Sequence, residues 1–192
     1  MPGKRLSCVP LADRHHGLTD VPRELLILRH AKSDWDGNAR SDFARPLAKR
    51  GQKDAPRVGA WMYREGLVPD LVVSSPAERA RETTHAVCKG LDYKPKAVVW
   101  DQAIYEAAVA DLLGLLARLP ANAKTVLLVG HNPGLEELLV YLVGDDVGEL
   151  DDGKLLPTAA LAHLEMPDNW SDLAPGCAQL INITLPKTPR SD

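Results

Sequence analysis

The sequence predicts a three-layer α/β/α sandwich with a mainly parallel sheet and an antiparallel edge. Short apolar runs alternate with stretches in which apolar residues recur at helical spacing, a pattern typical of parallel strands joined by helices. Two more apolar runs follow near the C-terminus without a long helix between them, which indicates antiparallel pairing. No internal repeat or linker divides the chain, so we expect one domain.

The expected strands are short, and most of them are almost uniformly apolar, as is typical of strands buried on both faces of a sheet. The last run differs because Ile181, Ile183 and Leu185 alternate with polar residues, so we expect one of its faces to be wet. In chain order the expected strands are 24–29, 70–74, 97–100, 125–129, 159–165 and 179–185.

The expected helices follow the first four strands. Pro56 lies inside the first helix and predicts a kink or a late start. Pro76 suits the first turn of the second helix, and Gly90 is expected to end it. The expected ranges are 48–65, 76–89, 111–119 and 133–143.

The domain is expected to span residues 23–187 of the 192-residue chain, a length that allows a sizeable core. Residues 1–22 mix proline, glycine and charge without a period, so we interpret them as a flexible N-terminal extension. This extension has no continuous apolar segment of the kind found in secretory signals, which favours a cytoplasmic protein.

The composition argues against several classes of protein. The net charge is −3, whereas nucleic-acid-binding proteins are usually strongly basic. No apolar run approaches the ~20 residues of a membrane-spanning helix, so neither nucleic acid nor membrane is an expected partner. Cys8, Cys88 and Cys177 are odd in number and far apart, which argues against a disulfide framework or a zinc site.

Histidines and arginines follow three of the expected strands. Arg29 and His30 come directly after the first, Arg79 and Arg81 lie in the first turns of the helix after the second, and His131 follows the fourth. Ligands of open parallel sheets bind beyond the carboxyl ends of the strands. We therefore expect these side chains to gather at one edge.

Phosphoryl transfer suits this set of residues. Arginine binds phosphoryl oxygens with a fixed fork of donors, and helix N-termini add free N–H groups. A neutral imidazole can attack phosphorus and form a covalent intermediate. A second imidazole, if protonated, stabilises the oxygens as charge redistributes. Arginines and histidine together leave no need for a metal ion.

Three motifs, LRHAKS at 28–33, SSPAERARET at 74–83 and VGHNPG at 129–134, resemble those of the histidine phosphatase superfamily, also called phosphoglycerate-mutase-like. The DFARPLAKRGQ segment at 42–52 supports this likeness, which covers residues 24–185. The small SixA-like branch of phosphohistidine phosphatases is the most similar. The resemblance implies a phosphoglycerate-mutase-like fold and an activity that needs neither a cofactor nor a metal ion.

Carried over by motif, the resemblance implies that His30 is the nucleophile that becomes phosphorylated. It implies that Arg29 and Arg79 bind the phosphoryl group, and that His131 is the second imidazole of the pocket. Glu106 lies where mutase-like relatives place a general acid, although a solvated glutamate at the start of a helix fits it equally well.

Several neighbouring residues have alternative interpretations. Lys32 and Ser33 follow the nucleophile and could contact phosphate, whereas a solvated charge is the more ordinary role for Lys32. Arg45 could line the pocket, but a structural role in its loop is favoured. Arg81 is expected at the rim or surface, because its position is variable in the family pattern.

The short segments between the motifs leave no room for the insertions that cap the pocket in larger relatives. An open, shallow pocket favours a phosphorylated side chain on a protein, such as a histidine-containing phosphotransfer domain. Two alternatives remain, a phosphatase for a small phosphoester and a phosphate-binding module without catalysis. A nucleophile would be unnecessary in the latter.

Overall fold

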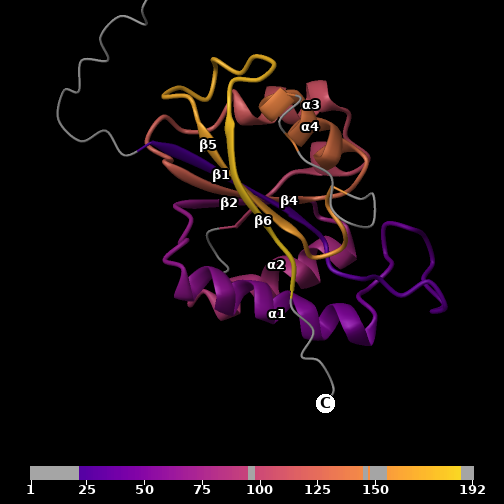
Figure 1. The fold of residues 1–192 in the computed structure, drawn as a ribbon. Helices are drawn as coiled ribbons and strands as arrows, with labels where there is room; N and C mark the ends of the chain where they lie inside the picture. The colour runs from indigo at the N-terminus through magenta and orange to yellow at the C-terminus, as the bar shows by residue number, and fades with distance from the viewer. Residues whose placement is uncertain (1–21, 95–97, 145–146, 148–154, 187–192) are drawn as a thin grey trace, which may run out of the picture.

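Six strands form one mixed sheet in the computed structural model, which describes residues 22–94, 98–144, 147 and 155–186 (Figure 1). The strand order is β3-β2-β4-β1-β5-β6. The first four strands of this order are parallel, and β5 and β6 are antiparallel to their neighbours, which confirms the predicted fold class. The strands are β1 (Arg23–Arg29), β2 (Leu71–Ser74), β3 (Val98–Trp100), β4 (Thr125–Gly130), β5 (Leu161–Met166) and β6 (Gln179–Thr184).

Helices cover both faces of the sheet, so each parallel strand contributes to two cores. Leu26 and Leu28 of β1 pack on the side of α1 and α2, whereas Leu25 and Ile27 pack on the side of α3 and α4. This alternation explains why the strand is apolar throughout. The helices are α1 (Lys49–Arg64), α2 (Glu78–Gly90), α3 (Val109–Leu116), α4 (Gly134–Val143) and the short 3-10 helix η2 (Gln102–Ile104).

The helices α1 and α2 approach closely because two glycines lie between them. A Cβ atom on Gly59 would meet the carbonyl oxygen of Val87, and one on Gly90 would meet the backbone of Ala60 and Gly59. Gly90 is the last residue of α2, which confirms the prediction that it ends the helix, and its missing side chain also permits the close packing. The late start predicted from Pro56 is wrong, since α1 begins at Lys49.

Two further boundaries differ from the predictions. The helix α3 begins at Val109 and ends at Leu116, which leaves Leu119 only partly buried beyond it. In β6 a register shift lies opposite His163 and Leu164, and Ile181 is the residue without a partner. Because of this bulge Leu180 and Ile183 pack on the core while Ile181 is 47% exposed, so simple alternation is wrong here.

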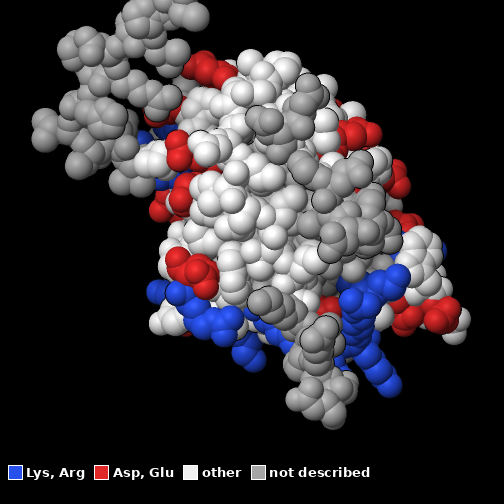
Figure 2. Space-filling view, in the orientation of Figure 1, with Lys and Arg blue, Asp and Glu red and all other residues white. Residues whose placement is uncertain are grey.

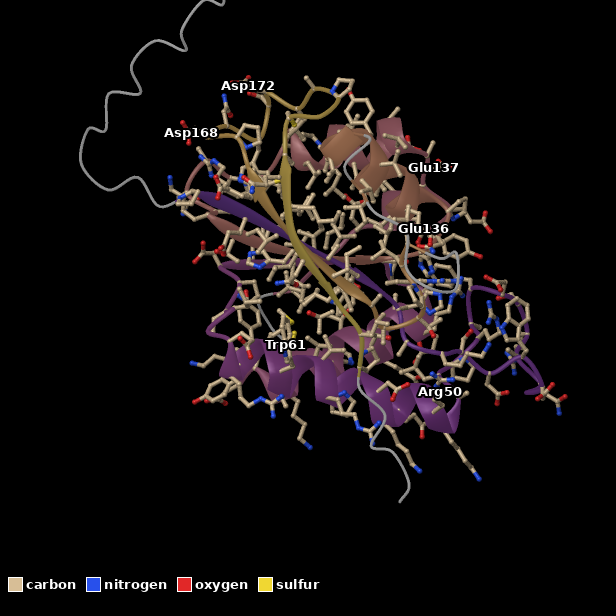
Figure 3. The ribbon with its side chains drawn as sticks, in the orientation of Figure 1. Arg50, Trp61, Glu136, Glu137, Asp168 and Asp172 are labelled. Carbon is tan, nitrogen blue, oxygen red and sulfur yellow. The ribbon has the colours of Figure 1, made fainter. Side chains whose placement is uncertain are left out.

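Charge is distributed over the outer sides of the layers. Lysine and arginine side chains gather along α1 (Figure 2). Arg50 extends from this helix and Glu137 from α4 (Figure 3). None of the described helices is long and apolar enough to cross a membrane. Residues 1–21 and 95–97, which include the start of the expected third strand, lie outside the described residues.

Candidate active site

The pairing of β1 with β4 places two histidines side by side. The strands are parallel, and Arg29 is paired with Gly130, so His30 and His131 each follow a paired residue. The backbone N–H of His30 donates to the carbonyl of Gly130 at 3.1 Å. The two imidazole centroids are 5.0 Å apart. The register of two buried strands therefore fixes the separation of the rings.

A pocket of about 510 Å³ opens at this edge of the sheet. Every residue that the sequence singled out for the site lies in its lining, except Arg81. The lining also includes residues that the motifs did not indicate. It consists of Arg29, His30, Lys32, Ser33, Trp35, Asp42, Arg45, Arg79, Glu106, Ala107, His131, Asn132, Pro133, Gly134 and Thr158.

The backbone sets the tautomer of His30. Its Nδ1 lies 2.8 Å from the carbonyl oxygen of Ala31, which can only accept, so Nδ1 carries the proton. The Nε of Arg79 donates to His30 Nε2 at 3.3 Å. Burial lowers the pKa of His30 to about 3, although the bond to Ala31 acts in the opposite direction. Near neutral pH the ring is therefore neutral, and the unprotonated Nε2 accepts from Arg79.

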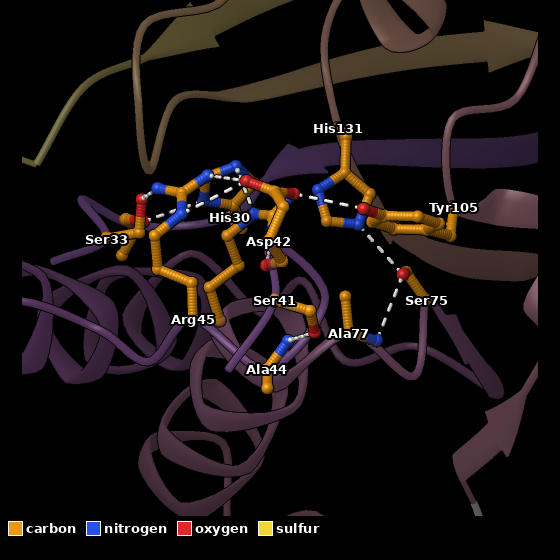
Figure 4. A network of polar contacts seen from close by, with 12 residues as sticks. His30, Ser33, Ser41, Asp42, Ala44, Arg45, Ser75, Ala77, Tyr105 and His131 are labelled. Carbon is orange, nitrogen blue, oxygen red and sulfur yellow. Dashed lines mark hydrogen bonds and ion pairs between the residues drawn. The ribbon is translucent and has the colours of Figure 1, made fainter. Parts of the chain in front are cut away.

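His131 is held by a serine after β2. Its Nε2 lies 2.8 Å from the hydroxyl oxygen of Ser75, and the same oxygen accepts a hydrogen bond from the N–H of Ala77 (Figure 4). Its Nδ1 is buried and has no hydrogen-bond partner among the described residues. Burial and the charge of Arg79 lower the pKa of His131 to about 3, so this imidazole is neutral in the ligand-free pocket. A bound phosphoryl dianion would raise that pKa.

Arg79 and Arg29 approach the nucleophile from different elements. Arg79 lies in the first turn of α2 and is 5% exposed. Arg29 ends β1, and its NH1 donates to the carbonyl of Leu156 at 2.8 Å. The Nε of Arg29 is buried without a partner among the described residues, so it can donate to a ligand. The roles of both arginines in binding phosphate stay predictions.

Asp42 connects the arginines, although the sequence analysis did not single it out. Its Oδ2 accepts from NH2 of Arg79 at 3.0 Å and from the hydroxyl of Tyr105 at 3.0 Å. Its Oδ1 accepts from NH2 of Arg45 at 2.6 Å (Figure 4). Burial raises the pKa of Asp42, but bonds from Arg45 and Tyr105 and the charge of Arg79 outweigh it and lower the pKa to about 2. Asp42 is therefore a carboxylate, not a proton donor.

Arg45 has both of the roles that were weighed for it. It is 8% exposed and lines the pocket, and its NH1 donates to the hydroxyl of Ser33. Its guanidinium also lies over the ring of Trp35, 3.6 Å from the centroid. Ser33 is thus occupied by an arginine in the ligand-free protein, while Lys32 is exposed at the rim.

Glu106 reaches the pocket from the segment after η2. Its backbone has a φ of 55°, in the left-handed region that few residues other than glycine adopt, and its side chain is exposed. Tyr105 precedes it, and the phenol ring meets His131 edge-on at 5.5 Å. The turn at Glu106 therefore places a carboxylate in the pocket wall, while the phenol of Tyr105 contacts two lining residues, Asp42 and His131. A role for Glu106 as proton donor stays a prediction.

Three other residues lie away from the pocket. Arg81 is exposed and lies over the ring of Trp100, as expected for a residue outside the site. His85 is exposed and contacts the same ring. His163 is buried in β5 and pairs with Glu24 at 3.2 Å. Among the described residues, no group of three or more His, Cys, Asp or Glu side chains is arranged to hold a metal ion.

Comparisons with known proteins agree with this geometry. A sequence model of the histidine phosphatase superfamily (branch 1) matches residues 25–117. An uncharacterized protein of Mycobacterium tuberculosis is 33% identical over 165 residues, which cover 83% of this chain and 100% of that protein.

Two solved structures are similar over most of their length. A candidate phosphohistidine phosphatase SixA from Nakamurella multipartitia has a TM-score of 0.73 and 31% identity, covering 86% of this chain and 97% of that one. Another from Agrobacterium tumefaciens has a TM-score of 0.70 and 29% identity, covering 86% and 99%. With the two paired histidines, these similarities show that the chain belongs to the histidine phosphatase superfamily.

Proposed function

We propose that the protein removes phosphate from phosphohistidine on another protein, through a covalent phosphohistidine intermediate on His30. The observation that carries this proposal is the fixed tautomer of His30. The carbonyl of Ala31 holds the proton on Nδ1, and burial keeps the ring neutral, so Nε2 is the nucleophilic atom.

In the first step the lone pair of His30 Nε2 attacks phosphorus, and the bond between phosphorus and the substrate nitrogen breaks. The leaving imidazole takes that electron pair and departs neutral, because its other ring nitrogen has taken a proton from solvent. Arg29 and Arg79 supply donors for the phosphoryl oxygens. In the second step water attacks the phosphorylated His30, releases phosphate and returns the neutral imidazole.

The contribution of His131 follows from its free Nδ1. When the hydroxyl of Ser75 donates to Nε2, the proton of the neutral ring is on Nδ1. That N–H can donate to a phosphoryl oxygen, and the dianion would favour a second proton on the ring. His131 therefore gains positive charge when a phosphoryl group binds, although burial alone favours the neutral ring.

A small phosphoester is the second candidate substrate, and Glu106 is the observation that favours it. An alkoxide leaving group needs a proton more than an imidazole does, and an exposed carboxyl group in the pocket wall can supply one. For a phosphohistidine substrate we expect Glu106 to be dispensable.

The test is phosphate release from a phosphohistidine-bearing protein, with a chelator present, by wild type and by His30→Ala. Release by wild type that His30→Ala abolishes supports the proposal and its independence of metal ions. Activity on small esters with none on phosphohistidine would favour the second candidate. A protein inactive on both would be a phosphate-binding module.

A further inference from the structure

The pocket has a buried floor and an exposed rim. His30, Arg79 and His131 form the floor and are 5–8% exposed, whereas Trp35 at the rim is 70% exposed. In phosphoryl transfer the attacking and leaving atoms lie roughly in line on opposite sides of phosphorus. Because the nucleophile lies in the floor, the leaving group of a bound substrate points toward the rim.

Trp35 is the most exposed large hydrophobic side chain among the described residues, yet its ring is not loose. One face is covered by the guanidinium of Arg45, at 3.6 Å from the ring centroid, a distance that favours a cation–π contact. An indole with one face held and most of its surface open is suited to stacking.

Arg45 is itself held by hydrogen bonds, so it holds the indole of Trp35 in a defined position. The guanidinium is 8% exposed and donates to Ser33 and to Asp42, with Nε and NH2 at 3.1 and 2.6 Å from Asp42 Oδ1. The N–H of Asp34 donates to the carbonyl of Pro46 at 2.9 Å, which closes the base of the loop that carries the indole. The tryptophan is therefore preorganised at the mouth of the pocket.

We propose that Trp35 binds the leaving group, with its indole stacked on the imidazole ring of phosphohistidine. The inference rests on the proposed function and adds a recognition residue to it. Aromatic rings gain from offset or edge-to-face contacts with other flat rings, and the indole lies at the rim toward which the leaving group points. Trp35 thereby selects a phosphoryl group carried on a ring over one carried on a small group.

The experiment compares two substrates with the same P–N bond. Free 3-phosphohistidine has a ring as leaving group, whereas phosphoramidate loses ammonia and has no ring to stack. For Trp35→Ala we expect kcat/KM to fall about tenfold on phosphohistidine and less than about twofold on phosphoramidate. Trp35→Phe keeps a flat ring and should retain most of the phosphohistidine activity.

Trp100→Ala is the matched control. Trp100 is a partly exposed tryptophan beside an arginine, Arg81, and it lies outside the pocket. The Trp100→Ala variant should leave the ratio of the phosphohistidine and phosphoramidate activities unchanged. Equal losses on both substrates for Trp35→Ala, or no loss on either, would overturn the proposal. Failure of the proposed function would give a different result. Wild-type protein would then hydrolyse phosphoramidate but not phosphohistidine, and the role of Trp35 would be lost with the proposed function.

Discussion

The floor and the rim of the pocket are built in different ways. In the floor, His30 and His131 follow two strands paired in register, and burial lowers the pKa of both to about 3. At the rim, Trp35 and Glu106 come from loops and remain exposed. The comparison indicates that the sheet fixes the positions of the two imidazoles, and we propose that the loops select the phosphorylated group.

The largest effect is expected from an arginine of the floor. Arg79→Ala removes the donor that lies 3.3 Å from His30 Nε2, so kcat/KM should fall about 10³-fold. Arg81→Ala, two residues along the same helix but exposed and outside the pocket, should change it little. Steady-state kinetics of both variants provide the check, and similar losses in the two would contradict the assignment of Arg79 to the floor.

The next prediction separates a loss of stability from a loss of activity. A Cβ on Gly59 would meet the backbone of Val87. A Cβ on Gly51 would meet the backbone of Lys32, which lies two residues after His30. Both alanine variants should lose about 2–3 kcal/mol of unfolding free energy in urea. Only Gly51→Ala should also lower kcat of the folded protein. Equal kcat in the two variants would show that the Lys32 backbone does not position the site.

Asp42 joins floor and rim, since it accepts from Arg79 and from Arg45. Asp42→Asn removes the charge and turns an amide N–H₂ toward arginine donors, so kcat/KM should fall about tenfold on both phosphohistidine and phosphoramidate. Asp36→Asn, in the same loop but outside the pocket lining, is the control. A loss confined to phosphohistidine would mean that Asp42 serves the rim alone.

The last prediction concerns the dependence of stability on pH. The pKa of His30 and of His131 lies near 3 in the folded protein and near 6.5 when exposed, so the unfolded chain binds more protons between these values. Stability should therefore fall as pH drops below 6.5, by up to about 1.4 kcal/mol per pH unit for each ring. Urea unfolding at pH 4.5–6.5 should show a smaller slope for His131→Asn, and an unchanged slope would contradict the neutral ring.

The floor could be predicted from sequence because its residues follow strands that periodicity identifies. Apolar runs before His30 and His131 indicate buried strands, and parallel strands bring their carboxyl ends to one edge. Asp42 and Ser75 were missed because their roles depend on contacts between distant segments. Asp42 meets Tyr105 across 63 positions, and Ser75 meets His131 across 56. No local pattern encodes such a contact.

An error in β6 has a similar origin. The bulge depends on the pairing of β6 with β5, so the alternation around Ile181 could not reveal which residues are buried. Gly90 ends α2 as predicted, but its close approach to the backbone of Ala60 on the neighbouring helix could not be predicted from the sequence. Sequence periodicity indicates which face of an element is buried and leaves open what that face meets.

The most direct test of the central claim is to identify the phosphorylated atom during turnover. The protein is mixed with a phosphohistidine substrate and quenched in base, which preserves phosphoramidates, and the product is analysed by mass spectrometry and ³¹P NMR. The account predicts phosphate on Nε2 of His30, because Nδ1 donates to the carbonyl of Ala31. Phosphate on Nδ1, label on another residue, or turnover by His30→Ala would contradict it.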